Sequence, residues 1–487
     1  MRAKQTPLVL RLTDRTTNVY ELAAIIRSAI LDNGLRAGAS LPSTRDLAVQ
    51  LGVSRNTVIR ALEQLADEDL VEARRGAGIF VKASKFLERV KDRPAYPYVL
   101  TEWATALPDA EMFKVRVANG VDLRPGIPDL ALIPHDEWRS SAARKLRTLK
   151  AKIGDYGLPN GDPDLRQSIA AYIARSRGVF ASPDNIIITA GAQQAFYLIT
   201  RVLIPRDTKV AVEEPGYLPM IQTLRAAGAA IYPVSVDNEG LRVQDIPAGV
   251  KAVYVTPSHQ FPLGVTMSQA RRRELVNWAH IANGFIIEDD YDSEYFFSQS
   301  ASAALHSSVE TDRVLYVGTF SKNLMPGIRV GYLVVPEVLK KVFENGRFLI
   351  DCHSDNMMQA VLAEFMGSGM FSRHVLKMRK IYAARHAALQ AAGPAFEAVG
   401  AQLLPSQFGL HACLRLPDWV DEDALIESAR LCLVGLHGLK PYFSGERRFP
   451  GLVIGFGNVP LEKLTAALRK IVTLIQPRED RARNSRD

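Results

Sequence analysis

The stretch Gly318–Tyr332, GTFSKNLMPGIRVGY, contains a lysine where a positive charge is costly. Lys322 follows the run RVLYVGTF, which has the composition of a buried strand, and Leu324, Met325 and Pro326 come next. Burying an ammonium group without a partner costs several kcal/mol or lowers its pKa. A lysine whose amine is kept neutral in this way can form a Schiff base with an aldehyde. The stretch therefore predicts a covalent site for a carbonyl compound.

The surrounding region has the pattern of a parallel sheet covered by helices. Strand-like runs (NIIITA, KVAVEE, AVYVTP, GFIIEDD, RVLYVGTF and GYLVVP) alternate with helical patterns. This alternation is typical of α/β domains. We therefore predict an α/β body with a mostly parallel sheet over residues 121–475.

Pyridoxal phosphate is the common biological aldehyde that a lysine holds, and candidates for its other partners are present. The cofactor needs a carboxylate at its pyridinium nitrogen, a phosphate cradle and a ring stacked on its face. Asp289 and Asp290 end the strand GFIIEDD, at the sheet edge where ligands bind, and the phenol of Tyr291 can hydrogen-bond the ring oxygen. We prefer Asp289 because alternation places residues 289 and 291 on one face.

The phosphate cradle is predicted at the stretch IIITAGAQQAF, where a strand passes through a glycine turn into a helix. Backbone N–H groups at a helix start suit a phosphate. Taken singly, each of these motifs has an ordinary structural explanation, so their order and spacing carry the prediction. The predicted groups are Gly191, Ala192, Gln193, Thr319, Ser321 and Arg329 for the phosphate, with Tyr217 stacking on the ring.

The pattern of helices and strands expected in residues 1–82 predicts a DNA-binding head. A helical pattern near Val19–Leu31 precedes a second helix that Ser43 caps, and Gly52 then makes a turn before a third helix capped by Ser54. Two short strands follow, around the basic turn 74–78. Two short helices joined through a glycine, with polar residues on the second, can insert a helix into the major groove.

The predicted DNA contacts lie on the exposed face of these helices and on the basic turn. Arginine can pair with guanine and asparagine with adenine. The first 93 residues hold 16 Lys and Arg against 11 Asp and Glu, so they carry +5 of the formal charge of +8. The alternative from pattern alone is a three-helix packing module with a solvated polar face. The predicted contacts are Ser43, Thr44, Arg45, Ser54, Arg55, Asn56, Thr57, Arg60, Arg74 and Arg75.

The two regions resemble known families. Ala37–Val81 resembles the winged helix-turn-helix of GntR-type transcription regulators, and Asp122 to about Leu474 resembles fold-type I, aspartate-aminotransferase-like enzymes. The second resemblance rests on the motifs DLRPGIPD, YGLPNGDPDLRQSIAAYI, TPSHQFPLG, IIEDDYDSEY and GTFSKNLMPGIRVGY. Together the regions resemble the MocR/GabR group of regulators. The resemblance implies a mostly parallel sheet, a smaller C-terminal α+β subdomain and bound pyridoxal 5'-phosphate.

The resemblance also implies roles for residues. Lys322 is the implied Schiff-base lysine and Asp289 the pyridinium partner. Aminotransferases place an asparagine beside the ring, whereas TPSHQFPLG offers Ser258, His259 and Gln260 there, a pattern typical of the regulator group. Tyr156 matches a tyrosine that reaches the phosphate of the neighbouring subunit. This implies a homodimer, in which each head can be exchanged onto its partner's body.

One departure concerns the substrate carboxylate. Aminotransferases usually hold it with an arginine that opens the late strand, and here the strand GLVIGFGNV offers Val453 and Ile454. Either the anchor is displaced to Arg447, Arg448 or Arg415, or an amino-acid carboxylate is not bound in the usual way.

Other features of the sequence argue against a membrane protein, a secreted disulfide-rich protein and a zinc protein. No run approaches the length of a membrane span, the start is not typical of a signal peptide, and three separated cysteines fit neither a disulfide framework nor a zinc site. We therefore expect a cytoplasmic protein without a metal. We expect a head at 1–82, a linker at 83–120, a body at 121–475 and a charged, disordered tail at 476–487.

The leading functional hypothesis is a regulator that binds double-stranded operator DNA. Its body would bind pyridoxal phosphate and an amino-acid-like compound as its signal. The first alternative is an active aminotransferase with an accessory head. The second is a DNA-binding protein whose body is a dimerisation scaffold with a vestigial site.

Overall fold

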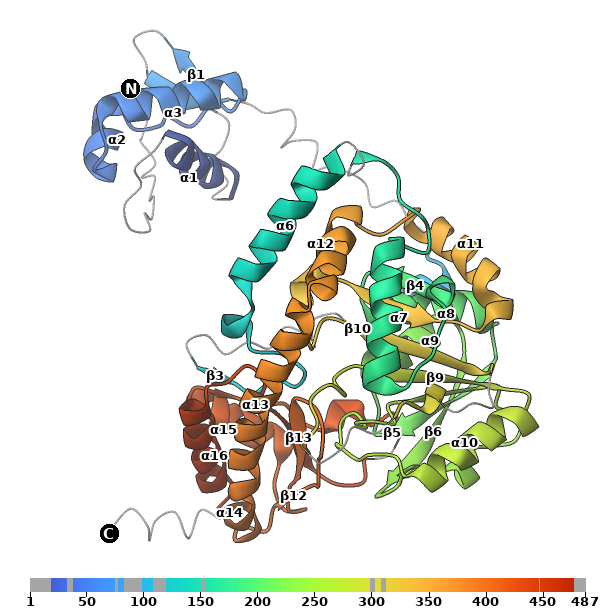
Figure 1. The fold of residues 1–487 in the computed structure, drawn as a ribbon. Helices are drawn as coiled ribbons and strands as arrows, with labels where there is room; N and C mark the ends of the chain where they lie inside the picture. The colour runs from blue at the N-terminus through green and yellow to red at the C-terminus, as the bar shows by residue number, and fades with distance from the viewer. Residues whose placement is uncertain are drawn as a thin grey trace. The chain divides into compact units, whose positions relative to one another are not determined.

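The computed structural model describes residues 19–32, 38–74, 78–82, 99–107, 120–150, 154–297, 303–307, 312–445 and 447–476. The chain divides into two compact units, one up to Val99 and one from Leu100 onward. Each unit is described by itself (Figure 1). The predicted linker, 83–120, lies mostly outside the described residues, and so does the predicted tail beyond Gln476.

The first unit has the predicted winged helix-turn-helix elements. They are α1 (Val19–Asp32), α2 (Thr44–Leu51), α3 (Arg55–Asp67), β1 (Val71–Arg74) and β2 (Gly78–Val81), and the two strands pair antiparallel. Ser43 and Ser54 accept hydrogen bonds from the backbone of Asp46 and Thr57, so both predicted caps are confirmed. Gly52 ends α2 with φ 63°, a conformation that favours glycine. The apolar stripes of the three helices pack together into one small core.

The second unit is built on an eight-stranded sheet. Its strands are β4 (Ile186–Thr189), β5 (Lys209–Glu214), β6 (Ala230–Asp237), β7 (Gly240–Leu241), β8 (Ala252–Val255), β9 (Phe285–Asp290), β10 (Val314–Thr319) and β11 (Gly331–Val334). Their order is β4-β11-β10-β9-β8-β5-β6-β7. The pairs from β10 to β6 are parallel, whereas β11 runs antiparallel to both its neighbours and β7 to β6. The predicted mostly parallel sheet is therefore confirmed.

Helices cover both faces of this sheet, which explains why its strands are apolar on both sides. One face packs against α8 (Ala192–Leu203), α9 (Leu218–Ala226) and α11 (Lys340–Asp351). The other packs against α7 (Pro163–Arg177) and α10 (Gln269–Ile281). Two further helices, α6 (His135–Leu149) and α12 (Asn356–Gly367), pack against each other beside α7 (Figure 1).

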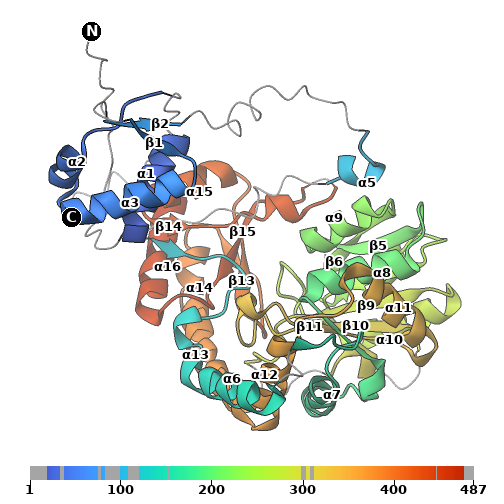
Figure 2. The same cartoon turned by 90° about the horizontal axis from the view of Figure 1, so that it is seen from above.

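A smaller α+β subdomain completes the unit (Figure 2). It contains the antiparallel sheet β12 (Gln402–Leu403), β13 (His411–Arg415) and β15 (Gly451–Gly455) with the helices α13 (Met370–Ala391), α14 (Gly393–Glu397), α15 (Glu422–Leu431) and α16 (Leu461–Ile475). The early strand β3 (Val121–Asp122) pairs in parallel with β14 (Val434–Gly435). The start of the body therefore returns to its C-terminal part. Among the described helices, none combines the length and the hydropathy that a bilayer crossing needs.

Candidate functional site

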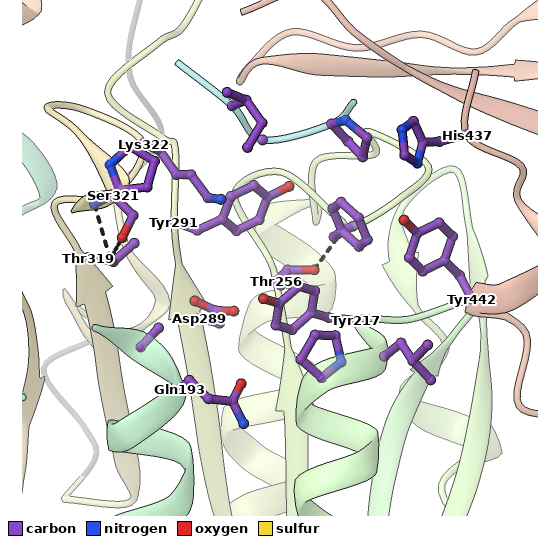
Figure 3. A pocket seen from close by; sticks show the side chains of 18 of the residues that line it. Gln193, Tyr217, Thr256, Asp289, Tyr291, Thr319, Ser321, Lys322, His437 and Tyr442 are labelled. Carbon is purple, nitrogen blue, oxygen red and sulfur yellow. Dashed lines mark hydrogen bonds between the residues drawn. The ribbon is translucent and has the colours of Figure 1, made fainter. Parts of the chain in front are cut away.

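A cavity of about 470 Å³ lies between the large sheet and the C-terminal subdomain. This volume is in the usual range for small-molecule sites. Figure 3 shows Lys322, Asp289 and Gln193 toward one end and His437 and Tyr442 toward the other. Nine of the residues predicted for the cofactor line it: Ala192, Gln193, Tyr217, Asp289, Tyr291, Thr319, Ser321, Lys322 and Arg329.

Lys322 stands just after the carboxyl end of β10, whose six residues are all buried. Its side chain is partly exposed to the cavity. Burial lowers the pKa of Lys322 below its ordinary value, although the carboxylates of Asp292 and Asp289 act in the opposite direction. A side chain at position 126 would meet the amine, since a Cβ on Gly126 would lie 3.0 Å from Lys322 Nζ. The glycine therefore leaves room for this amine.

Asp289 offers a buried carboxylate on the same side of the sheet. Its Oδ2 accepts a hydrogen bond of 2.7 Å from the hydroxyl of Tyr254, and its Oδ1 has no hydrogen-bond partner among the described residues. Burial raises the pKa of Asp289 to about 7, against the lowering effects of Tyr254 and Lys322. Asp290 points to the other face, where it bonds Arg177 at 2.6 Å. The alternation thus places Asp289, not Asp290, in the cavity.

An anion cradle lies where β4 leads into α8. Gly191 stands before the helix with φ 80°, and no side chain caps the first N–H groups. Arg329 reaches this turn and donates from Nη2 to the carbonyl of Ala190 at 2.8 Å. Uncapped helix N–H groups beside a guanidinium form a favourable site for a phosphate. The hydroxyls of Thr319 and Ser321 lie 3.1 Å apart on the cavity wall.

The two tyrosines of the predicted site are held by different contacts. Tyr217 is packed edge-on against Phe196 and Phe261, with ring centroids 6.3 and 5.5 Å apart. Tyr291 donates its hydroxyl to the carbonyl oxygen of His259 at 2.8 Å. Both rings line the cavity, so each is available to a bound aromatic ring.

Four predicted residues are not in the cavity lining; one is Gly191, which forms the turn before α8, and the other three are Ser258, His259 and Tyr156. Ser258 is buried and accepts a 2.5 Å hydrogen bond from Arg177, while His259 Nδ1 lies 2.9 Å from Asp292. These partners hold both side chains within the protein. Tyr156 is 85% exposed, with its ring edge-on to His353. Its predicted role concerns a neighbouring subunit, so it stays a prediction.

The three arginines considered as displaced carboxylate anchors also lie away from the cavity lining. Arg447 pairs with Glu422 at 3.1 Å, and Arg448 bonds the hydroxyl of Ser235. The guanidinium of Arg415 lies 5.1 Å from the ring centroid of Phe449. Of the two alternatives, the structure favours the absence of the usual carboxylate anchor.

Sequence reasoning missed several lining or supporting residues. Tyr254 and Thr256 could have been found, because alternation along β8 places them on one face with Asp289 nearby. His437 and Tyr442 gave no local signal, since they reach the cavity from the C-terminal subdomain.

The predicted DNA-contact face is largely exposed. Arg45, Arg55, Asn56 and Arg60 are exposed on α2 and α3, and Arg55 Nε lies 3.4 Å from the hydroxyl of Thr44. The hydroxyls of Ser43 and Ser54 serve as helix caps. Arg74 pairs with Glu72 and covers the ring of Phe80, whereas Arg75 lies outside the described residues.

Comparison with protein families assigns both units. Residues 18–81 match the bacterial regulatory proteins of the gntR family, and residues 119–429 match aminotransferase class I and II. A multiple substrate aminotransferase of Thermococcus profundus has a TM-score of 0.71 at 25% identity, covering 79% of this chain and 98% of its own. A kynurenine aminotransferase of Pyrococcus horikoshii, solved with PMP, has a TM-score of 0.69 at 25% identity, covering 80% and 98%.

Three relatives that match most of this chain are named as regulators. The probable rhizopine catabolism regulatory protein MocR of Rhizobium meliloti is 30% identical, covering 89% of each chain. The transcriptional regulator TauR of Rhodobacter capsulatus is 34% identical over 75% of this chain and 77% of its own. The pyridoxine biosynthesis regulator PdxR of Corynebacterium glutamicum is 29% identical, covering 96% and 97%. The chain therefore belongs to the MocR-type helix-turn-helix transcription regulators, which join a gntR-family domain to an aminotransferase class I and II domain.

Proposed function

We propose that this regulator binds pyridoxal phosphate in the cavity at Lys322 and that a small amino compound entering the same cavity alters its binding to operator DNA. The observation that carries the proposal is the convergence of Lys322, Asp289 and the start of α8 on one cavity.

The residues present fit this cofactor. The free Oδ1 of Asp289 suits a pyridinium N–H, and the uncapped start of α8 with Arg329 suits a phosphate. When bound, pyridoxal phosphate supplies an aldehyde that reacts reversibly with primary amines. Lys322 offers an amine whose pKa burial lowers, and Asp289 would hold a proton at the ring nitrogen. Tyr291 and Tyr217 orient the ring and exclude water from its surroundings.

We further propose a homodimer in which Tyr156 contributes to the partner's site. A tyrosine that is 85% exposed lacks the burial expected of a large ring and leaves its hydroxyl free for an intersubunit contact. Sedimentation of the full-length protein should give the mass of two chains. Tyr156→Phe should weaken cofactor binding without changing that mass.

The test of the proposal compares the wild-type protein with Lys322→Ala. Purified wild-type protein should absorb visible light, and after borohydride reduction the cofactor should remain on the peptide containing Lys322. The variant should lose this adduct. Affinity for DNA from the region beside the gene should change by about 5-fold or more between cofactor-free and loaded protein. An adduct on another lysine, or equal DNA affinity in both states, would contradict the proposal.

Catalysis as an aminotransferase is the second candidate, and the likeness of the body to solved aminotransferases favours it. Efficient transamination requires a substrate held by its carboxylate, in most such enzymes through a bidentate arginine. The arginines considered for this role lie elsewhere, so we expect slow turnover with amino acid and 2-oxo acid pairs. Turnover near ~10 s⁻¹ with a natural pair would establish an enzyme instead.

A further inference from the structure

The wall that the C-terminal subdomain adds to the cavity is mostly apolar. It consists of Ile426, Leu436, His437, Gly438, Pro441 and Tyr442, and Pro125 and Ile127 adjoin it in the lining. Tyr442 packs edge-on against Phe261 with ring centroids 5.1 Å apart, and Phe261 in turn packs against Tyr217 at 5.5 Å. A row of three aromatic rings therefore leads from the cofactor site to the far wall.

This wall is held in place from the large sheet. Glu214 accepts backbone hydrogen bonds from Ser444 at 2.8 Å and Gly445 at 2.9 Å. The backbone N–H of Gly216 donates to the carbonyl of Tyr442 at 3.0 Å. These bonds connect the sheet to the segment that carries Pro441 and Tyr442. The apolar wall is thus preformed, which favours a ligand that matches its shape.

The lysine and the arginine that this chain contributes to the lining are assigned to the cofactor, and the histidine of the lining faces a carboxylate without bonding it. Among the described residues, the cavity lining contains one lysine, Lys322, and one arginine, Arg329. The proposed function assigns both to the cofactor. His437 is the other basic group, and its Nε2 lies 3.9 Å from a carboxylate oxygen of Asp122. Arg124, which follows nearby in the chain, is paired with the same Asp122 at 2.5 Å.

We infer that the amino compound recognised here is a primary amine with an apolar, aromatic body and no carboxylate. This inference rests on the proposed function, which requires the amino group to reach the cofactor, and it specifies the rest of the ligand. A carboxylate against this wall would lose its hydration without gaining a guanidinium partner. An aromatic ring would bury apolar surface and meet the row of Tyr217, Phe261 and Tyr442 in favourable edge-on contacts.

The experiment compares amines with the amino acids that differ from them by one carboxylate. Full-length, cofactor-loaded protein is titrated with phenylethylamine against phenylalanine and with 3-methylbutylamine against leucine. Binding is followed by the cofactor spectrum and by thermal stabilisation. Each amine should bind about tenfold or more tightly than its amino acid, and phenylethylamine more tightly than 3-methylbutylamine. Equal binding, or tighter binding of the amino acids, would overturn the inference.

A matched pair of variants tests the role of the wall. Ile426→Arg places a guanidinium on the lining, whereas Leu431→Arg places it on the same helix at a site that is 73% exposed. Ile426→Arg should raise the affinity for phenylalanine relative to phenylethylamine by about tenfold, and Leu431→Arg should not change the ratio. An unchanged ratio in a folded Ile426→Arg protein would contradict the assignment. If Ile426→Arg does not fold, the comparison of ligands on the wild-type protein decides the question.

The two proposals fail in different ways. Protein that never takes up the cofactor would overturn both the proposed function and this inference. Protein that takes up the cofactor at Lys322 but prefers amino acids would overturn only the inference about the ligand.

Discussion

Replacing Gly331 with alanine tests the phosphate cradle without removing a group that would touch the cofactor. Gly331 is the first residue of β11 and pairs with Thr189 of β4. It lies directly behind the turn at Gly191. A Cβ at position 331 would lie 2.8 Å from the carbonyl carbon of Gly191 and 3.0 Å from the backbone nitrogen of Ala192.

The size of the effect follows from these contacts. Carbon atoms pack best at roughly 3.5–4.0 Å, so the turn or the strand must move by about half an ångström or more. Overpacking of this kind costs about 1–3 kcal/mol. If the strain is relieved by moving the start of α8, the binding free energy of the cofactor falls by about this much, which corresponds to a Kd weaker by roughly 5- to 150-fold.

The assay is a titration of cofactor-free protein with pyridoxal phosphate, followed by absorbance, with thermal unfolding as a check of the fold. Gly327→Ala is the matched control, because a Cβ there meets nothing within 4 Å. It should bind the cofactor as the wild type does. A folded Gly331→Ala protein with wild-type affinity would show that the turn at Gly191 does not hold the phosphate.

Three further changes have defined outcomes. Tyr254→Phe removes a hydrogen-bond donor to Asp289 and raises the pKa of that carboxyl further above about 7. Cofactor affinity should therefore fall, and most near pH 7, where more of Asp289 becomes protonated. The dependence of the cofactor's Kd on pH measures this effect. Burial raises the pKa of Glu213 to about 8 from an ordinary 4.5, so the folded state holds this proton more tightly and loses stability as pH rises between these values. Glu213→Gln should flatten that loss, and melting temperatures at pH 6 and pH 8 would show it. Arg55→Ala or Arg60→Ala should cost about 1–3 kcal/mol on the specific DNA site; unaltered binding in both variants would argue against the recognition face.

Local patterns account for the parts of the site that could be predicted. Lys322 could be singled out because a charged side chain directly after a buried strand is energetically costly. Asp289 could be singled out because side chains alternate between the two faces of a strand. The helix caps at Ser43 and Ser54 follow from backbone chemistry within four residues. Each of these predictions depends on neighbours in the chain, so one sequence was sufficient.

The rest of the site depends on distant residues. Ser258 and His259 belong to a recognised motif, but Arg177 and Asp292 hold them away from the cavity lining. His437 and Tyr442 become neighbours of the large sheet only when β14 pairs with β3 and Glu214 binds the segment after Tyr442. No periodicity in the sequence indicates contacts between residues this far apart in the chain.

The segment that precedes the body packs next to the cavity that we propose for the cofactor. The short helix α5 (Glu102–Thr105) packs against α9, and Trp103 and Leu107 line a second cavity together with Gln193 and Arg329. Gln193 and Arg329 also line the cofactor cavity. If the proposed cofactor binds here, a phosphate that fixes these two side chains would change the surface on which α5 packs. Because a ligand shifts an equilibrium only through differential contacts, this shared wall is where such a difference between loaded and empty protein would arise.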